Sequence, residues 1–458
     1  MSGDDGNTLL LRDAGAALVD TGNGPQLQRD ISLLLRDGWI ERIGPAAELA
    51  GHAAATIDVS RHVLVPGLIN THHHFFQTLT RCWPAAQSLG LFDWLRAQYP
   101  LWSRIDPPAL HAAARVTAME LLLSGCTTSV DHGYFWPNGC RVDDVIEAVA
   151  PLGLRLHACR GAISLGASRG GLPPDEAVEE DDAIIADCER VLARYHDPAP
   201  GAMLRIALAP CSPYSVTPAL MRSTAALARR HGVGLHTHLA ESREERDFCR
   251  RALGTTPAGY AESLEWVGAD VWFAHGIHLD ATERLRLGHH GCGIAHCPCS
   301  NMRLGTGIAP VRALREAGLT VGIGTDGAAS NDSSHLLQEA RQALLLQRAG
   351  GGAGALTPAE ALELATRGGA AVLGRPELGR LAAGCVGDIA AFRLDDPAFA
   401  GGAVHDPLAA LVLSPPPRAD LVLVHGMPRV RDGRLTGADP RDAVAALNGC
   451  VRRLMDAP

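Results

Sequence analysis

The sequence predicts an α/β protein: a (β/α)8 TIM-like barrel with a small β-sandwich domain built from both chain ends. Three observations support this fold class. The middle of the chain alternates short apolar strands with amphipathic helices, both ends are rich in strands and tight turns, and 458 residues suffice for one large domain and a smaller companion. An open doubly wound sheet is the alternative, but no glycine-rich phosphate turn follows the first strand.

Strand-and-turn segments occupy the two ends of the chain. At each end an Asp-Gly pair lies between apolar runs, which indicates a hairpin. We therefore assign residues 1–64 and 378–439 to one composite β domain, residues 65–377 to the barrel and residues 440–458 to a C-terminal helix. The expected strands and turns are Thr8–Arg12, Ile31–Arg36, Asp37-Gly38, Trp39–Ile43, Gly387–Phe392, Leu421–Val424, Arg429-Val430 and Asp432-Gly433.

Eight apolar segments in the middle of the chain are the expected barrel strands. Eight strand–helix units over about 310 residues fit a fold whose typical size is about 250 residues. The helices include Leu110–Leu123, followed by Gly125, and Leu220–His231, which Gly232 ends as a left-handed cap. The strands are expected at Val63–Ile69, Thr127–Asp131, Leu154–Arg160, Leu204–Pro210, Gly234–Leu239, Val271–His275, Gly293–Cys297 and Leu319–Asp326. Residues 166–182, rich in glycine, proline and acids, are expected to form a long loop and a lid.

Composition excludes several classes of protein. The net charge of -9 and the lack of a basic run argue against a nucleic-acid partner, and no apolar run is long enough to cross a membrane. The acidic, polar start is unlike a secretory signal, so we expect a cytoplasmic protein. All 41 Lys and Arg residues are arginine, which excludes Schiff-base catalysis, a P-loop lysine and a metal site bridged by a modified lysine.

The twelve cysteines fit no small disulfide framework, and we expect them to be mostly buried thiols. The spacing of Cys297-Pro-Cys299 resembles that of a metal-binding cysteine pair. No second cysteine pair accompanies it, so a structural role is favoured.

Polar residues gather where four of the expected strands end, which is where active sites of barrels lie. The first strand ends in Asn70-Thr-His72-His-His74, and alternate residues of an extended chain share a face, so His72 and His74 point together. The fifth strand contributes His236-Thr-His238, the sixth His275, and the eighth Asp326. Three histidines and one aspartate would hold a single divalent ion such as zinc or iron(II), with an open position for water.

Each of these pieces has an ordinary structural interpretation. A single histidine at a strand end is usually just hydrogen-bonded, and a Gly-Thr-Asp-Gly segment alone is most often a turn. Their joint occurrence at four strand ends favours the metal site. Asp131-His132 is left open between substrate contact and packing. A structural or supporting role is expected for His73, His236, His278, His289, His290 and His296.

The combined motifs resemble the amidohydrolase superfamily, in its mononuclear cytosine/guanine deaminase-like branch, over nearly the whole chain. The motifs are Pro66-Gly-Leu-Ile-Asn-Thr-His72-x-His74, His238-x-x-Glu241, His275, His296-Cys-Pro-x-Ser-Asn301 and Gly324-Thr-Asp326-Gly-Ala-Ala-Ser-Asn331. The resemblance implies metal ligands at His72, His74, His238 and Asp326. It implies that Glu241 and His275 handle protons, with Asp326 as the base that accepts a proton from water.

Further motifs resemble the 8-oxoguanine deaminases of this branch. They are His74-Phe-Phe-Gln77-Thr-Leu-Thr-Arg81, Cys126-Thr-Thr-Ser-Val-Asp131-His132, Arg160-Gly-Ala-Ile-Ser164 with Gly170-Gly-Leu-Pro-Pro-Asp175, and Ala209-Pro-Cys211-Ser-Pro-Tyr214. The implied reaction converts 8-oxoguanine to urate and ammonia, and isocytosine shares the same amino-lactam edge. We expect Gln77, Arg160 and Cys211 to bind the substrate, with Tyr214 nearby. Many adenosine-type deaminases have a histidine where Cys211 stands, which argues against a nucleoside substrate.

Several alternatives remain at this point. A guanine deaminase or a triazine aminohydrolase would use the same residues, and a catalytically silent barrel that only binds a partner is the alternative from another class. The zinc deaminases that edit nucleic acids need a Pro-Cys-x-x-Cys motif, and Pro210-Cys211 and Pro298-Cys299 both lack its second cysteine. We expect one divalent metal ion, zinc before iron(II), a small heterocyclic substrate and assembly as a homo-oligomer.

Overall fold

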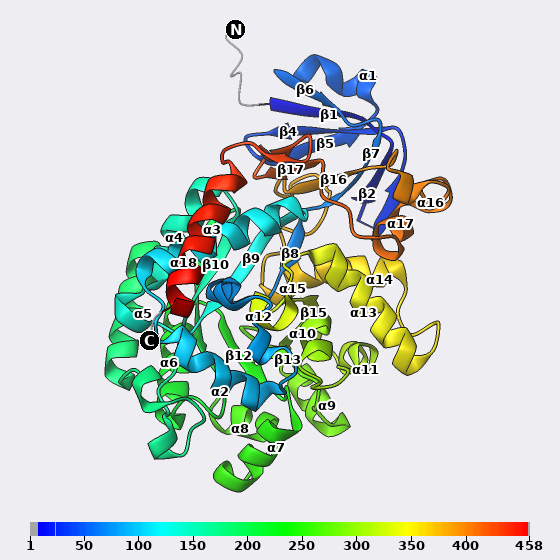
Figure 1. The fold of residues 1–458 in the computed structure, drawn as a ribbon. Helices are drawn as coiled ribbons and strands as arrows, with labels where there is room; N and C mark the ends of the chain where they lie inside the picture. Colours follow the sequence, from blue (N-terminus) through cyan, green and yellow to red (C-terminus); the bar gives the residue numbers. More distant parts are fainter. Residues whose placement is uncertain (1–7, 23, 457–458) are drawn as a thin grey trace.

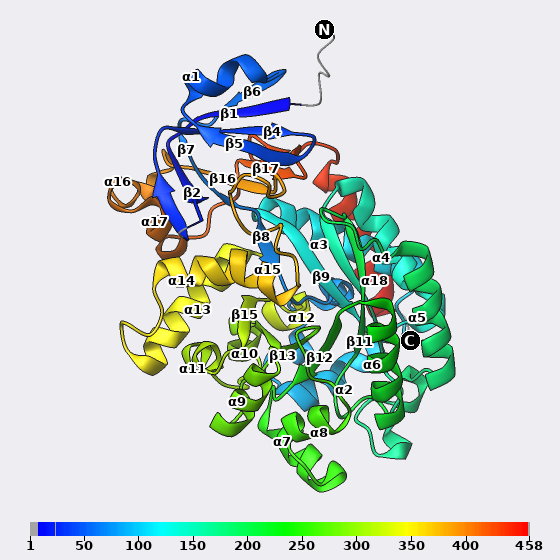
Figure 2. The same ribbon diagram turned by 180° about the vertical axis from the view of Figure 1, so that it is seen from behind.

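The computed structural model describes residues 8–22 and 24–456, and its centre is a barrel of eight parallel strands (Figures 1 and 2). The strands follow one another around the barrel in chain order, and a hydrogen bond from Thr71 N to Ile323 O (2.9 Å) joins the last strand to the first. The predicted (β/α)8 barrel is confirmed. Its strands are β8 (Leu68–Asn70), β9 (Cys126–Gly133), β10 (Arg155–Ala162), β11 (Leu204–Pro210), β12 (Leu235–Leu239), β13 (Val271–His275), β14 (Gly293–His296) and β15 (Thr320–Ile323).

Helices surround this barrel, and half of the fourteen begin with a proline or a side-chain cap that suits a helix N-terminus. Gly232 ends α6 at φ +65°, as the sequence predicts. The helices of the barrel ring are α2 (Leu91–Trp102), α3 (Pro107–Leu123), α4 (Val142–Val149), α5 (Asp181–Tyr195), α6 (Pro218–His231), α7 (Arg243–Phe248), α8 (Pro257–Ser263), α9 (Ala281–His289), α10 (Pro298–Arg303), α11 (Val311–Glu316), α12 (Ala328–Asn331), α13 (Leu336–Gly351), α14 (Pro358–Glu363) and α15 (Gly369–Val372). Residues 166–180 form the expected loop, with two short 3-10 turns, before α5.

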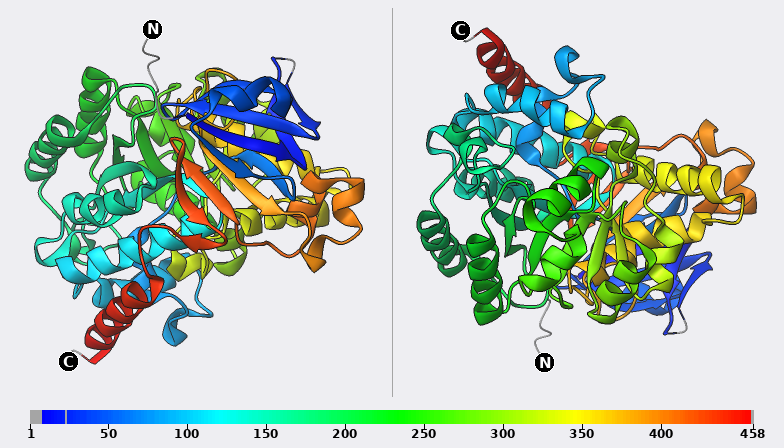
Figure 3. Two further views of the ribbon diagram at one scale, coloured as in Figure 1. Left: turned by 90° about the horizontal axis from the view of Figure 1, so that it is seen from above. Right: turned by 90° about the horizontal axis from the view of Figure 1, so that it is seen from below.

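Segments from both chain ends form two further sheets that pack face to face above the barrel (Figures 1 and 3). Leucine, isoleucine, valine and alanine side chains from both sheets share one buried core, so they form the expected sandwich. One sheet has the order β5-β4-β1-β6 and the other β19-β18-β17-β16-β7-β2-β3. Their strands are β1 (Thr8–Ala14), β2 (Ala16–Asp20), β3 (Pro25–Gln28), β4 (Ile31–Arg36), β5 (Trp39–Gly44), β6 (Ala55–Asp58), β7 (His62–Pro66), β16 (Ile389–Arg393), β17 (Leu421–Val424), β18 (Met427–Arg431) and β19 (Arg434–Leu435).

The remaining helices lie outside the barrel ring. They are α1 (Ala46–Leu49), α16 (Gly402–His405), α17 (Pro407–Leu413) and α18 (Pro440–Asp456). The last of these lies along α3 (Figure 1). A C-terminal helix was expected from residue 440; the division of the chain into domains at 64/65, 377/378 and 439/440 stays a prediction.

The predicted first barrel strand, Val63–Ile69, is wrong as a single element. The structure divides it at Gly67 into β7, which belongs to the sandwich, and β8, which belongs to the barrel. A Cβ atom at position 67 would lie 2.2 Å from Thr127 Oγ1, so only glycine allows the chain to pass this close to β9. Because of this break, one apolar run contributes a strand to the sandwich and a strand to the barrel.

The two expected hairpin turns are confirmed. Asp37 and Gly38, between β4 and β5, have φ of 50° and 85°, and Asp432 and Gly433, between β18 and β19, have 53° and 68°. Two consecutive positive φ values define the tight turn that matches the twist of the paired strands.

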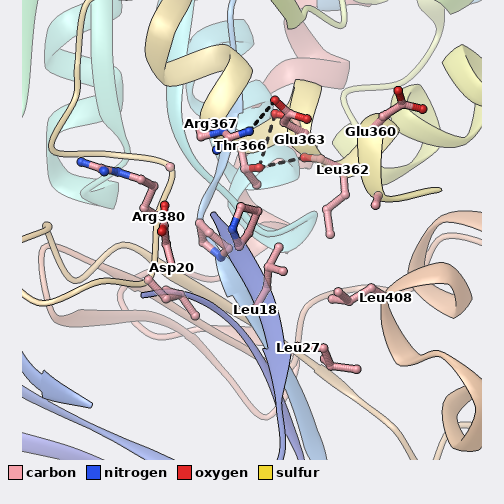
Figure 4. Close-up of a pocket in the computed structure, with 15 residues that line it drawn as sticks. Leu18, Asp20, Leu27, Glu360, Leu362, Glu363, Thr366, Arg367, Arg380 and Leu408 are labelled. Carbon is pink, nitrogen blue, oxygen red and sulfur yellow. Dashed lines mark hydrogen bonds and ion pairs between the residues drawn. The ribbon is translucent and has the colours of Figure 1, made fainter. Parts of the chain in front are cut away.

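A cavity of about 190 Å³ lies between the sandwich and the helical part of the chain (Figure 4). Leu18 and Leu27 line it from the β2–β3 hairpin, and Leu362 lines it from α14. Glu363 and Arg367 form an ion pair at its edge, 2.9 Å apart. None of the histidines at the strand ends lines this cavity.

The cysteines of the described residues are free thiols, and none belongs to a group with metal-ligand spacing. In the same residues, no helix is long and apolar enough to cross a membrane.

A buried ion pair joins the barrel to the sandwich. Arg155, on β10, is fully buried and donates to both carboxylate oxygens of Asp388, at 3.0 and 3.2 Å. Arg155 also donates to Ala202 O at 2.8 Å, and Asp388 accepts from His425 N at 2.7 Å. The pair thus connects a barrel strand with the segment between β17 and β18.

We predict that Arg155→Met lowers the free energy of unfolding by about 3–5 kcal/mol, because Asp388 would stay buried without its partner cation. Urea unfolding followed by circular dichroism measures the change. Arg36→Met is the matched control, since Arg36 pairs with Glu41 at the surface and its loss should have little effect. Equal stabilities for the two variants would contradict the prediction.

Candidate metal and active site

Histidine and carboxylate side chains from five barrel strands converge at the carboxyl end of the barrel. This end lies away from the sandwich (Figure 1). Two overlapping groups have metal-ligand spacing, with ligand atoms within 4.8 Å of one another. The first group is His72, His74, His132 and His238, and the second is His72, His238, His275 and Asp326. All of these side chains are buried. The structure therefore brings together the ligands that the sequence predicts, with His132 and His275 beside them.

His74 and His238 direct acceptor nitrogens at each other. The Nδ1 atom of His74 lies 2.7 Å from His132 O, and the Nδ1 atom of His238 lies 2.7 Å from Cys211 O. A carbonyl only accepts, so both Nδ1 atoms carry the proton, and in the neutral rings both Nε2 atoms carry a lone pair. These two Nε2 atoms are only 3.1 Å apart. Two lone pairs at this distance repel unless a cation lies between them.

Asp326 adds a carboxylate to the same point. Its Oδ1 atom lies 3.3 Å from His72 Nε2 and 3.1 Å from His74 Nε2. Its Oδ2 atom accepts hydrogen bonds from Ser300 Oγ (2.6 Å) and Ser330 Oγ (3.1 Å). Hydrogen bonds from these two serines and from Gly327 N (2.8 Å) stabilise the ionised carboxylate of Asp326, which burial alone would disfavour.

These donor atoms fit a divalent cation. Burial lowers the pKa of His72 well below its ordinary value and that of His238 to about 3, so both imidazoles are neutral, as metal ligands must be. The Nε2 atom of His72 is buried without a hydrogen-bond partner. Neutral imidazoles with one carboxylate are the ligand set of a catalytic zinc site or of a comparable divalent ion.

His275 and Glu241 flank the cluster on one side. His275 Nδ1 lies 2.9 Å from Asn301 Oδ1, and its buried Nε2, which has no hydrogen-bond partner, lies 3.6 Å from Glu241 Oε1 and 3.9 Å from Asp326 Oδ2. Burial, reinforced by the charge of Asp326, raises the pKa of Glu241 well above its ordinary value. The surroundings therefore favour the protonated form of Glu241 and the ionised form of Asp326.

Glu245 holds the backbone on which Glu241 sits. Its two carboxylate oxygens accept from Ala240 N (2.9 Å) and Glu241 N (2.8 Å), and its side chain is fully buried. Ser242 caps α7 by accepting from Glu245 N. Sequence reasoning missed this residue, although Ser242-x-x-Glu245 has the spacing of a capping box, in which the glutamate normally returns to the cap residue itself.

Gln77 and Tyr134 lie next to His74 and Asp326. Gln77 Nε2 donates to Tyr134 Oη at 3.3 Å, and Gln77 Oε1 is buried without a partner. The Tyr134 ring packs edge-on against His74, with centroids 4.9 Å apart. A Cβ atom at Gly327 would lie 1.9 Å from Gln77 Oε1, so the glycine after Asp326 leaves room for this amide.

The other two predicted substrate contacts lie in different surroundings. Cys211 is beside the cluster, with Sγ 3.9 Å from His238 Nδ1, and burial raises the pKa of its thiol to about 12. The structure does not bring Arg160 to the cluster. Its guanidinium pairs with Glu179 (2.7 Å) and Asp187 (2.6 Å), so it anchors the end of the loop and α5. On a strand, Arg160 alternates with the inward residues and faces the helices instead.

Asp131 and His132 support the cluster. Asp131 Oδ1 accepts from Phe75 N at 2.8 Å, and the His132 carbonyl accepts from His74. Both contacts hold the segment that carries His72 and His74. Tyr214 is buried between Phe92 and Phe248, with ring centroids 4.9 and 6.3 Å away.

A barrel with a buried group of histidines and an aspartate suited to a metal ion is the architecture of a metal-dependent hydrolase. Residues 63–427 match the model of the Amidohydrolase family. The chain belongs to the amidohydrolase family.

Similar proteins agree with this assignment over nearly the full length. The chain is 50% identical over 424 residues to an 8-oxoguanine deaminase from Pseudomonas aeruginosa, covering 92% of this chain and 94% of the relative. It is 38% identical over 446 residues to a hydroxydechloroatrazine ethylaminohydrolase from Pseudomonas sp. strain ADP, covering 93% and 91%. A crystal structure of an atrazine chlorohydrolase from Arthrobacter aurescens TC1, complexed with zinc, superimposes with a TM-score of 0.92 at 33% identity, covering 97% of this chain and 100% of that one. The predicted enzyme class, a hydrolase acting on C–N bonds, is confirmed.

We predict that Glu245→Gln lowers kcat by about tenfold or more without loss of metal. The amide group of glutamine would face a backbone N–H, and a buried unpaired donor costs about 1–3 kcal/mol, where 1.36 kcal/mol corresponds to tenfold in rate. Steady-state kinetics and metal analysis check both parts. Glu360→Gln is the matched control, because Glu360 is also the capping glutamate of a helix, α14, but lies away from the cluster. Wild-type kcat in Glu245→Gln would refute the positioning role.

Proposed function

We propose that this enzyme is a hydrolytic deaminase of a purine-like base, with 8-oxoguanine as its substrate and urate and ammonia as products. One observation carries the proposal: acceptor atoms of His72, His74, His238 and Asp326 converge, and only a cation makes that arrangement favourable. The 50% identity to an 8-oxoguanine deaminase over most of both chains supports the choice of substrate.

These four residues are the proposed ligands of one divalent ion. Zinc is the proposed metal, since three imidazoles and a carboxylate suit it and a related structure contains it. When bound, the ion would lower the pKa of a water molecule from about 15.7 to roughly 7 and so supply hydroxide at neutral pH.

The protein groups around the proposed ion divide the proton transfers between them. Asp326 Oδ2, which faces His275 rather than the ligand nitrogens, accepts a proton from the attacking water. His275 Nε2, an acceptor because Nδ1 donates to Asn301, orients that water by accepting a hydrogen bond. Glu241, whose protonated form burial favours, donates to the ring nitrogen next to the amino-bearing carbon and then assists the departure of ammonia.

Gln77 and Cys211 are the proposed substrate contacts. The unpartnered Oε1 of Gln77 offers an acceptor to a ring N–H of a lactam, and Cys211 lies beside His238 in the same buried site. Arg160 is left out of the proposed contacts because its guanidinium is engaged by Glu179 and Asp187. Guanine, isocytosine and hydroxylated triazines are the competing substrates.

The first test is a substrate panel on enzyme of known metal content. We expect one equivalent of zinc per chain and ammonia release from 8-oxoguanine with a higher kcat/KM than from guanine, isocytosine or hydroxyatrazine. Removal of the metal with a chelator should abolish turnover, and one equivalent of zinc should restore it. Turnover that survives complete metal removal would rule out the mechanism. Iron(II) restoring more activity than zinc would change the metal, and guanine as the best substrate would change the substrate.

Glu241→Gln tests the proposed acid. Loss of a general acid should lower kcat about 10²–10⁴-fold, while zinc binding stays intact because Glu241 is not a proposed ligand. Glu244→Gln is the matched control, an exposed glutamate three residues along the same segment. Near-normal turnover in Glu241→Gln, or loss of zinc from it, would exclude the assigned role.

A further inference from the structure

His236 contacts His72 through the one nitrogen of His72 that faces away from the cluster. The distance from His72 Nδ1 to His236 Nε2 is 2.7 Å, and both side chains are fully buried. His74 and His238 use main-chain carbonyls at the equivalent position. Among these three, His72 is therefore the one whose orientation depends on another side chain.

The direction of this hydrogen bond follows from the next contact. His236 Nδ1 lies 2.8 Å from Trp272 O, in the parallel register that pairs His236 with Trp272. Because a carbonyl only accepts, His236 Nδ1 carries the proton and Nε2 of the neutral ring accepts. The His236 ring is fully buried against the Trp272 indole and the His72 ring, where an imidazolium charge would be unfavourable. His72 Nδ1 must then donate, and His72 Nε2 is left as a lone pair toward the cluster.

Trp272 also fixes the position of this chain of contacts. Its indole stacks on the His236 ring, with centroids 4.6 Å apart and an angle of 11° between the planes. Its Nε1 donates to Thr71 O at 3.1 Å, one residue before His72. One side chain thus restrains His236 through its ring and the backbone of His72 through its N–H.

We propose that His236, supported by Trp272, is a positioning residue that sets the tautomer and orientation of His72 for metal binding. The inference rests on the proposed function, because it takes His72 as a ligand. A neutral imidazole acceptor behind a ligand histidine holds the ring in place and raises the basicity of the ligand nitrogen, as outer partners of metal-bound histidines do. The β12 strand would then contribute two histidines to the site, one as a ligand and one as its support.

Three substitutions separate the acceptor from the rest of the side chain. His236→Phe keeps a flat ring against Trp272 but has no acceptor. His236→Asn retains a donor for Trp272 O but is too short to reach His72, and His236→Gln is long enough to present Oε1 to His72 Nδ1. The inference predicts a zinc dissociation constant about 10–100-fold higher in His236→Phe and His236→Asn, and close to wild type in His236→Gln. Competition with a chromogenic chelator measures the constants, and His296→Phe, at another buried barrel histidine, is the control.

Thermal unfolding with and without zinc distinguishes positioning from a general structural role. The increase in Tm that zinc produces should shrink in His236→Phe and His236→Asn but not in His236→Gln. A loss of Tm that is the same with and without zinc would overturn the inference, as would a wild-type zinc affinity in His236→Phe and His236→Asn, or a His236→Gln variant as weak as those two. A wild-type enzyme that binds no zinc would instead overturn the proposed function on which the inference rests.

Discussion

The site depends on one electrostatic constraint: unprotonated nitrogens and an ionised carboxylate meet at a point buried inside the barrel. His74 and His238 place their Nε2 atoms 3.1 Å apart, and each has a carbonyl behind it that forces the lone pair inward. Attraction to a cation is stronger in such a buried site than in bulk water, and so is repulsion without one. The carbonyl contacts of His74 and His238 therefore hold the ring protons on the Nδ1 atoms, away from the point where the Nε2 atoms meet.

The barrel supplies this arrangement because its parallel strands end at one rim. Three residues where the chain leaves a strand near the cluster have positive φ although none is glycine: Ala240 (53°), His275 (74°) and Asp326 (61°). Such conformations cost of order 1–3 kcal/mol each and persist only where the surroundings impose them. Here the surroundings are identifiable, since Glu245 accepts from Ala240 N, Asn301 accepts from His275 and two serines donate to Asp326. The strained backbone at these three residues lowers the stability of the fold but orients the functional side chains.

Patterns local in sequence predicted much of the fold and the inner part of the site. Alternation placed His72 and His74 on one face, and the Asp-Gly pairs marked both hairpins, because these features depend on neighbours along the chain. The break at Gly67 was not predicted because it depends on a close contact with Thr127, sixty residues further along the chain. We expected Arg160 to contact the substrate because it lies near the end of a strand. The alternation of side chains along β10 instead directs it toward Asp187. Such errors arise wherever a role is decided by a distant partner.

Two carboxyl groups near the same point are driven to opposite protonation states by their different neighbours. Asp326 accepts hydrogen bonds from two serine hydroxyls and from Gly327 N, which stabilise its charge despite burial. Burial together with the charge of Asp326 raises the pKa of Glu241 and favours its protonated form. A reaction that first removes a proton from water and then delivers one to a ring nitrogen needs one base and one acid at neutral pH, and pairs of groups with divergent pKa values meet that need. Because the charge on Asp326 raises the pKa of Glu241, a proton accepted by Asp326 would remove that charge and make Glu241 a stronger acid for the next transfer.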